Sequence, residues 1–234
     1  FKDPRLIQFY NRFATYNGSS PYQTPGIMSM IPSLEQSFGT YFPEGGMHQI
    51  TKSLEKLAKD IGIQFHFNTK VEEIITKKSK VLGIKTGKSF VPSDIVISNA
   101  DIVTTYTKLL LKEKAPKRIL SQERSSSALI FYWGITKKFP DLDLHNIFFS
   151  ADYKNEFKRI FQDKLISDDP TVYINISSKE ESTDAPKGCE NWFTMVNAPT
   201  NNGQDWDAII IQTRINIIKK LSRVLKVDLS QLIN

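Results

Sequence analysis

The sequence predicts an α+β or α/β fold built around a mixed sheet, on the basis of three observations. Apolar residues recur every three or four positions between residues 47 and 61, as on one face of a helix. Short runs of alternating apolar and polar residues follow between residues 63 and 97, and longer β-type runs lie between residues 127 and 198. The 234 residues are 40% apolar, which is enough to bury one or two cores.

The first forty residues predict two helices separated by a loop. Pro4 follows Asp3 where a helix can begin, and Leu6, Phe9 and Phe13 then share one helical face, so we expect a helix that ends near Tyr16. Asparagine, glycine and proline in the segment 17–26 favour a loop. The second helix is expected over residues 27–38.

The middle of the chain predicts a helix, a strand, a small antiparallel meander and a returning strand. The helix over residues 47–61 ends at Gly62, and the alternating residues 63–67 predict the strand. Three short β-type runs predict the meander, and an apolar run predicts the returning strand; these are residues 71–75, 81–84, 90–91 and, for the returning strand, 95–97.

The remainder predicts a mixed sheet and a long helix. The expected strands are residues 127–135, 146–150, 171–176 and 192–198, with a short helix at 153–161 between them. The long helix begins near Asp205. One apolar stripe runs along it for four turns, through Ile211, Ile215, Ile218, Leu221 and Leu225.

Composition narrows the classes of function. The single cysteine, Cys189, excludes an internal disulfide framework and a cysteine zinc cluster, and favours a reducing compartment. His48, His66 and His145 are isolated, so no metal site is predicted. The net charge is +6, and lysines and arginines are concentrated at residues 108–124 and 214–226. We interpret both segments as solvent-exposed faces rather than binding patches. Because no RNA- or DNA-binding motif is present, we expect no nucleic-acid partner.

Six stretches carry a resemblance to a known family. They are RFATYNGSSPY (12–22), YFPEGG (41–46), NTKVEEI (68–74), DIVISNAD (94–101), SSSALIFYWGI (125–135) and APKGCENWFTMVNAP (185–199). Together they resemble the bacterial-type phytoene and carotenoid desaturases of the FAD-dependent amine-oxidase-like superfamily, and in particular the hydroxycarotenoid 3,4-desaturase branch. The resemblance covers essentially the whole chain.

The resemblance implies a domain organisation and FAD as the cofactor. Residues 1–43 and 108–234 would form a mixed-sheet substrate domain, into which residues 44–107 insert part of a Rossmann-like FAD-binding domain. The glycine-rich turn that grips the pyrophosphate of FAD, G-x-G-x-x-G, does not occur in the sequence, and neither does the family's glycine-rich C-terminal flavin segment. We therefore expect an internal fragment of a longer flavoenzyme, one that binds FAD poorly or not at all by itself.

The resemblance also implies which residues approach the cofactor. Gly45 and Gly46 precede a helix whose free N-terminal amides favour an electron-rich group. Main-chain groups around Val71 would read the adenine edge. Asn99, Ala100 and Asp101 would follow the returning strand to the edge of the flavin. Alternatively, Gly45 and Gly46 form an ordinary turn before the helix, and Asp101 is the N-terminal cap of a helix.

Substrate and catalytic residues are expected mainly among aromatic and charged side chains. Tyr16, Phe131, Tyr132 and Trp133 are candidate walls of an apolar tunnel, although plain core packing explains such residues equally well. The resemblance implies an acidic residue at Asp3 and an arginine at the position of Ile7. Arg5 or Arg12 would have to replace that arginine, and Asp3 is also a good helix cap.

These residues lead to one main hypothesis and two alternatives. The main one is FAD-dependent desaturation of a linear carotenoid, such as phytoene or a hydroxylated carotenoid, with hydride passing to the flavin. A redox-neutral carotenoid isomerase and a non-catalytic membrane-binding module are the alternatives. The oligomeric state is not predicted.

An enzyme that acts on a carotenoid has to reach a bilayer. The last helix carries isoleucines beside Arg214, Lys219 and Arg223, which suits an interfacial helix, although a core helix with a basic outer face has the same pattern. No leader or membrane span is predicted from the sequence. We expect a cytoplasmic protein, peripheral on the inner face of the cell membrane.

Overall fold

The computed structural model describes residues 1–234, which form two compact units. Unit 1 combines residues 1–53 and 124–234, and unit 2 contains residues 54–123. Unit 2 lies in sequence between the two segments of unit 1, and the assignment of the units to a substrate domain and a FAD-binding domain stays a prediction. The two boundaries of unit 2 fall later in the chain than the expected positions after residues 43 and 107.

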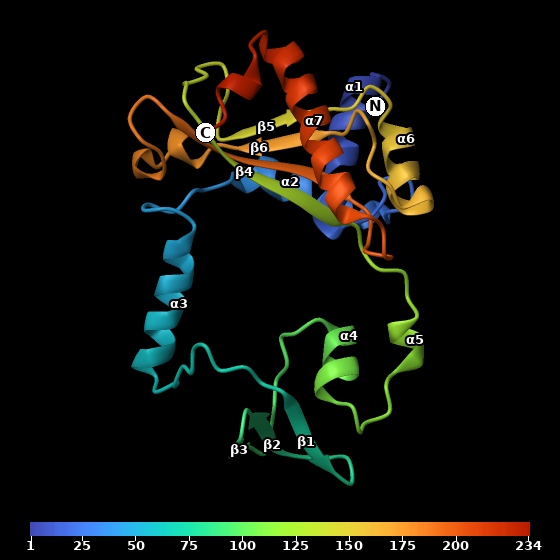
Figure 1. Ribbon diagram of the computed structural model, residues 1–234, viewed down its shortest axis with the longest axis vertical. Coiled ribbons are helices and arrows are strands. Elements are labelled where there is room, and N and C mark those ends of the chain that lie inside the picture. The colour runs from blue at the N-terminus through green and yellow to red at the C-terminus, as the bar shows by residue number, and fades with distance from the viewer. The chain divides into compact units, whose positions relative to one another are not determined.

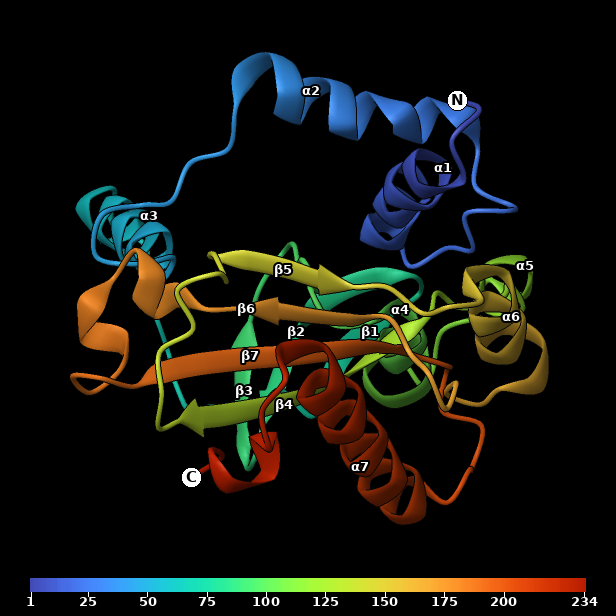
Figure 2. The same cartoon turned by 90° about the horizontal axis from the view of Figure 1, so that it is seen from above.

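A four-stranded sheet forms the centre of unit 1. Its order is β4-β7-β6-β5, and Figure 2 shows these strands side by side. The strands are β4 (Ser127–Ile135), β5 (His145–Phe148), β6 (Val172–Asn175) and β7 (Glu190–Ala198). Every pairing is antiparallel, whereas the spacing predicted a mixed sheet. β7 lies between β4 and β6 and runs antiparallel to both. An antiparallel sheet can pack one face on a core and leave the other face free.

One face of this sheet is buried under helix α7 (Trp206–Leu225) (Figure 1). Trp133, Trp192 and Val172 point to this face and pack with Ile217 and Leu221 of the helix. Side chains alternate along each strand, so the residues between these point to the opposite face. The core of unit 1 therefore lies on one side of the sheet only.

The buried side of α7 differs from the predicted stripe. Ile217 and Leu221 are fully buried, but Ile211 and Ile215 are more than half exposed. Apolar residues occur around most of this helix, so periodicity alone left its rotation open. Buried Lys220 fixes that rotation, because its ammonium group bonds to the loops at the end of the sheet.

The N-terminal helices match their predictions closely. α1 (Pro4–Asn11) is capped by Asp3 and continues as a 3₁₀ helix, η1 (Arg12–Asn17). A 3₁₀ turn, η2 (Gly26–Ser29), precedes α2 (Met30–Phe38). Figure 1 shows α2 on the side of the sheet opposite α7. The short helix predicted at 153–161 is α6 (Tyr153–Lys158) followed by a π-helical turn, η4 (Arg159–Asp163).

The amphipathic helix is α3 (His48–Asp60), whose apolar stripe, including Ile50, Leu54 and Leu57, is exposed. In unit 2 the meander forms as predicted, from β1 (Glu73–Lys77), β2 (Lys80–Thr86) and β3 (Ser89–Pro92). Gly83 allows the close approach of β2 and β3: its φ is 149°, and a Cβ there would lie 2.1 Å from the carbonyl oxygen of Val91. Two short helices, α4 (Ile102–Thr104) and α5 (Lys117–Leu120), and a π-helical turn, η3 (Thr105–Leu109), complete this unit.

Two expected strands of unit 2, at residues 63–67 and 95–97, are not formed. A strand needs a neighbour for its backbone hydrogen bonds, and no other strand of the chain pairs with either segment. Their side chains also lack a surface to pack on, since Phe67 is 66% and Ile97 92% exposed. Alternation at 63–67 and an apolar run at 95–97 predict these strands, but pairing decides whether they form.

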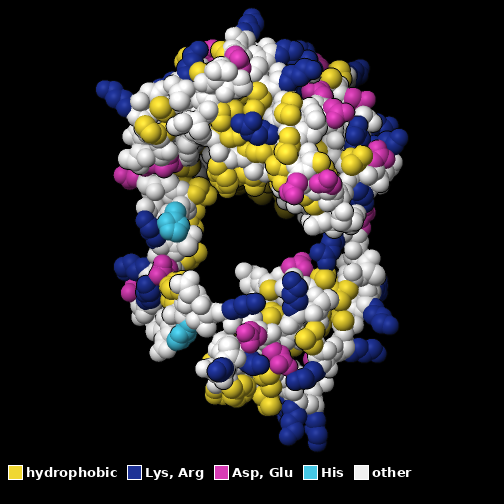
Figure 3. All heavy atoms as spheres, viewed as in Figure 1, with side chains coloured by type: hydrophobic (Ala, Val, Ile, Leu, Met, Phe, Trp, Pro, Cys, Tyr) yellow, Lys and Arg dark blue, Asp and Glu magenta, His cyan; other side chains and the backbone are white.

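Two further features concern the side chains on the protein surface and the length of the helices. Lysine and arginine side chains are scattered over the visible surface in Figure 3, while apolar side chains form a continuous area on unit 1. None of the helices combines the length and apolar composition needed to cross a bilayer.

Candidate functional site

The free face of the four-stranded sheet carries two rows of side chains. The first row runs across the sheet as His145, Asn175, Phe193 and Tyr132, and the second as Ile147, Tyr173, Met195 and Ile130. Most of these side chains are apolar or aromatic, yet they point away from the core. A sheet face of this kind needs a covering, and residues of α1, η1 and α2 supply part of it.

A first hollow of about 510 Å³ lies between this face and the N-terminal helices. Its walls are mainly aromatic and aliphatic, with one arginine and one glutamate: Phe9, Arg12, Phe13, Thr15, Tyr16, Glu35, Thr40, His145, Ile147, Tyr173 and Met195. Ligand pockets of about 300–1,000 Å³ are commonly lined in this way, by apolar side chains with a few polar groups.

A second hollow, of about 790 Å³, continues along the same face. It shares Thr40, His145 and Tyr173 with the first, so the two form one groove, which we call the sheet-face groove. Phe42, Met47, Leu144 and Phe193 line the second hollow, and Ser177, Glu180 and Asp184 give it a polar side. The groove extends over both hollows and is lined mainly by apolar and aromatic side chains, with polar side chains at the junction of its halves and on one side of each hollow.

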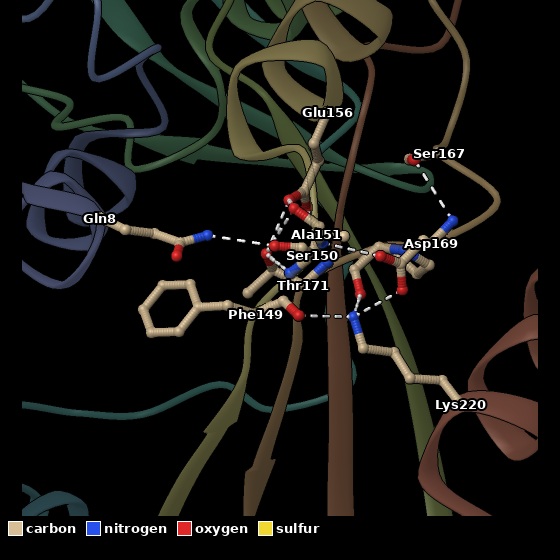
Figure 4. Close-up of polar contacts among 10 residues, drawn as sticks. Gln8, Phe149, Ser150, Ala151, Glu156, Ser167, Asp169, Thr171 and Lys220 are labelled. Carbon is tan, nitrogen blue, oxygen red and sulfur yellow. Dashed lines mark hydrogen bonds and ion pairs between the residues drawn. The ribbon is translucent and has the colours of Figure 1, made fainter. Parts of the chain in front are cut away.

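A buried polar network holds helix α1 against the end of the sheet (Figure 4). Glu156, which is 1% exposed, accepts hydrogen bonds from the hydroxyls of Ser150 (2.7 Å) and Thr171 (2.6 Å) and from the amide of Thr171 (2.9 Å). The side-chain amide of Gln8 donates to the carbonyl oxygen of Ser150 at 3.1 Å. This contact ties α1, and therefore the roof of the first hollow, to the strands below.

The same network perturbs an ionisable group. Burial raises the pKa of the Glu156 carboxyl, while the hydrogen bonds from Thr171 and Ser150 and the nearby Lys220 cation lower it; the net pKa lies above its ordinary value. Lys220 itself donates to the carbonyl oxygens of Phe149 and Pro170, each at 2.8 Å. The network is internally satisfied and lies outside both hollows, which indicates a structural role.

The predicted tunnel residues separate onto different sides of the sheet. Tyr16 lines the first hollow. Tyr132 lies on the groove face, where it is 79% exposed and contacts Phe193 edge-on. Phe131 and Trp133 point to the opposite face and pack in the core under α7. The structure therefore brings only Tyr16 into the groove and leaves Tyr132 beside it.

Asp3 and Arg5 form an exposed pair at the start of α1. The carboxylate of Asp3 accepts from the amide of Arg5 at 2.8 Å and pairs with its guanidinium at 2.7 Å. These hydrogen bonds lower the pKa of Asp3, so its side chain remains ionised at neutral pH. Asp3 is thus the predicted helix cap, and a catalytic role for this pair stays a prediction.

In unit 1, Gly45 and Gly46 form the turn before α3. Both have positive φ angles, 75° and 87°, which glycine adopts without strain. The amide of Gly46 donates to the carbonyl oxygen of Pro43, and no acidic residue lies in the first turn of the helix. In the first turn of α3 the amides of Gln49 and Ile50 already donate to the carbonyl oxygens of Gly46 and Met47, at 3.0 and 3.3 Å, so a contact of this turn with a cofactor stays a prediction.

The other residues expected near the cofactor lie in unit 2. Val71 precedes β1, and its main-chain groups make no hydrogen bond within the chain. Asp101 caps α4, accepting from the amides of Val103 and Thr104 at 3.0 and 3.1 Å. Asn99 and Ala100 are exposed in the preceding turn. The capping role of Asp101 is therefore confirmed, and its contact with a flavin stays a prediction.

These features fit parts of a flavin dinucleotide. A free N–H and C=O at Val71 match the hydrogen-bonding edge of adenine, and the first turn of α3 carries no acidic residue that would repel an electron-rich group. No residues of this chain match the glycine-rich pyrophosphate turn. No group of three or more His, Cys, Asp or Glu side chains is placed to hold a metal ion.

The sequence did not single out several residues of the groove. Among them are Tyr173 and Met195, while Arg12 is predicted only as a replacement for the arginine that the family has at the position of Ile7. Alternation along each strand was a usable signal, because Tyr173 and Asn175 lie between core residues Val172 and Ile174. Periodicity does not indicate which face of the sheet α7 covers.

Comparison with known proteins supports the same family. Residues 1–130 match the model of the family described as flavin containing amine oxidoreductase. The whole chain is 55% identical to a 1-hydroxycarotenoid 3,4-desaturase of Flavobacterium sp. (strain P99-3) and covers 48% of that protein. It is 31% identical, over its whole length, to a phytoene desaturase of Fusarium fujikuroi, of which it covers 45%.

A third relative and a solved structure extend the comparison. A 4,4'-diapolycopene oxygenase of Methylomonas sp. is 31% identical over 98% of this chain, which covers 47% of that protein. An oxidoreductase from Methanosarcina mazei has a similar fold, with a TM-score of 0.63 at 16% identity, over 95% of this chain and 50% of that one. The chain spans about half the length of the curated relatives it matches. It therefore belongs to the flavin-containing amine oxidoreductase family.

Proposed function

We propose that the protein carrying this chain is a flavin-dependent desaturase of linear carotenoids. The observation that carries this proposal is the sheet-face groove, which is long, lined mainly by aromatic and aliphatic side chains, and open on the face opposite the core. An extended polyene is a ligand that such a lining can bind along its length. The desaturases among the similar proteins support the same substrate class.

The residues of this chain would act by binding and orientation. Phe9, Phe13 and Met195 would hold the polyene against the sheet and exclude water from the reacting bond. A bound flavin would supply the hydride acceptor for the dehydrogenation. Unactivated C–H bonds are weak acids, so we assign more weight to this alignment than to a protein base, and Asp3 remains only a candidate.

The test uses the full-length protein with bound flavin, mixed with a linear carotenoid without oxygen. We expect the flavin absorbance to bleach and the product to lose two hydrogen atoms, with a longer-wavelength absorption maximum, because each new double bond extends the conjugated system. The measurements are anaerobic absorption spectroscopy and mass spectrometry of the extracted pigment.

Each competing function gives a different product. A product of unchanged mass with a changed double-bond geometry would overturn desaturation in favour of an isomerase. A product that has gained oxygen would instead indicate the chemistry named for the Methylomonas relative. Bilayer binding without any change of the pigment would favour the non-catalytic module.

Contact with a bilayer is a further part of this proposal. Ile211 and Ile215 are exposed on α7 beside Arg214, and this combination suits an anionic lipid surface. We expect the protein to float with vesicles that contain anionic lipid, and Ile211→Asn together with Ile215→Asn to reduce the bound fraction several-fold. Equal flotation of the wild type and the double variant would exclude α7 as the contact.

A further inference from the structure

A cluster of three polar side chains lies in the middle of the sheet-face groove. The phenol oxygen of Tyr173 is 2.8 Å from Nδ1 of His145, and Nδ2 of Asn175 is 3.3 Å from the same nitrogen. Asn175 and His145 are paired across β6 and β5, and Tyr173 is two residues before Asn175 on the groove face. The cluster is therefore part of the rigid sheet.

The hydrogen-bond directions in this cluster follow from its geometry. Nδ2 of Asn175 also donates to the carbonyl oxygen of Leu144 at 3.2 Å, which identifies it as the nitrogen of the amide. An amide nitrogen only donates, so Nδ1 of His145 is an acceptor and the ring proton lies on Nε2. Tyr173 then donates to Nδ1 as well.

The cluster consequently leaves one donor and two acceptors free. Nε2–H of His145 makes no hydrogen bond within the chain, nor does Oδ1 of Asn175, and the phenol oxygen of Tyr173 keeps lone pairs. An alcohol both donates and accepts one hydrogen bond, so it complements this set. A hydrocarbon would leave all three groups without a partner.

Apolar side chains flank the cluster in both hollows, and each hollow also carries charged residues, Arg12 and Glu35 in the first and Glu180 and Asp184 in the second. His145 and Tyr173 line both hollows, with Phe13 and Met195 in the first and Phe42 and Phe193 in the second. A ligand whose apolar chain lies along these aromatic and aliphatic side chains in one hollow would present a polar end to the cluster. That description fits a hydroxylated acyclic polyene better than its hydrocarbon counterpart.

We propose that Tyr173, His145 and Asn175 bind the hydroxyl group of a hydroxylated polyene and so select it over the hydrocarbon. This inference rests on the proposed function, because it names the substrate class of the same groove. It assigns specificity to the sheet face, while the apolar walls supply affinity for either ligand.

The experiment compares Tyr173→Phe with the wild type in the full-length flavin-bound protein. The substrates are one acyclic carotenoid with a tertiary hydroxyl at its end and the same carbon chain without it. We expect kcat/KM for the hydroxylated substrate to fall about tenfold, mainly through KM, because a net hydrogen bond is lost. The value for the hydrocarbon should fall much less, because the aromatic ring stays in the groove wall, so that the preference for the hydroxylated substrate disappears.

Two further variants complete the experiment: the first tests a second residue of the cluster, and the second is a matched control. His145→Leu removes the free donor from an exposed position and should reduce the same preference. Tyr10→Phe removes a phenol of the same unit whose oxygen accepts from Gln36 at 2.9 Å and which lines neither hollow. It should leave both substrates unaffected.

Equilibrium binding, followed by quenching of tryptophan fluorescence, separates the two proposals. If the wild type binds the hydroxylated polyene more tightly and Tyr173→Phe abolishes that difference, the hydroxyl site stands even where neither ligand is desaturated and the proposed function fails. If the protein desaturates both and Tyr173→Phe lowers both equally, or lowers neither, the hydroxyl site is wrong and the proposed function stands. Binding of neither ligand would overturn the hydroxyl site as well.

Discussion

Replacing Glu190 with alanine should lower the free energy of unfolding by about 3–5 kcal/mol. Glu190 is 3% exposed, and its carboxylate forms an ion pair with Lys179 at 2.9 Å. It also accepts from the amide of Phe139 at 3.0 Å and from the indole of Trp192 at 2.9 Å. The alanine variant would leave a half-buried cation and two buried donors without an acceptor, and it would open space beside the core.

Urea unfolding followed by tryptophan fluorescence measures this effect, because all three tryptophans of the chain lie in unit 1. Glu190→Gln should cost less, since the amide oxygen still accepts a hydrogen bond. Asp141→Ala removes an exposed carboxylate close to Phe139 in sequence and should change stability by less than about 0.5 kcal/mol. A Glu190→Ala variant as stable as Asp141→Ala would show that the buried ion pair contributes little.

Replacing Lys220 with methionine should destabilise the protein by about 2–4 kcal/mol. Lys220 is 7% exposed, and all three protons of its ammonium group have an acceptor (Figure 4): Phe149 O, Pro170 O and Asp169 Oδ1, each at 2.8 Å. Methionine fills a similar volume but leaves two carbonyl oxygens without a donor. The exposed neighbour Lys219, replaced in the same way, is the matched control and should have little effect.

The same replacement should change how stability depends on pH. Burial raises the folded-state pKa of Glu156, so its contribution is greatest below its ordinary pKa of 4.5 and is lost as the pH rises towards the folded value. The Lys220 cation is one of the groups that lower this pKa. Without it the folded pKa rises further, so the loss of stability that begins near pH 4.5 should continue to a higher pH and be larger in total. Parallel pH curves for Lys220→Met and Lys219→Met would contradict this coupling.

Local signals predicted most helices and strands of this protein. Asp3 and Pro4 start α1, the spacing of apolar residues gives α3, and the run of β-branched and aromatic residues gives β4 with its bounds. The segments 63–67 and 95–97 carry equally good strand patterns but remain unpaired. Their failure shows that a strand also needs a neighbour, which no local pattern supplies.

The candidate site was less accessible to sequence reasoning. The motif around Tyr16 predicts its place in the groove, whereas the pattern of residues 131–133 does not show that Phe131 and Trp133 point to the core and Tyr132 away from it. The partners in the polar cluster, His145 and Tyr173, are 28 residues apart and meet only through the pairing of β5 with β6. No periodicity within either segment indicates that contact.

The sequence by itself determined the family and the positions of α1, α3, α7 and the meander. Those features depend on residues that are close together in the sequence or on motifs that the sequence contains. Only the tertiary structure decided the strand order β4-β7-β6-β5, the face of the sheet that α7 covers, and therefore the face left free for the groove. Each of these depends on which distant segments pack together, because burial of one sheet face under α7 determines which alternating side chains remain available to a ligand.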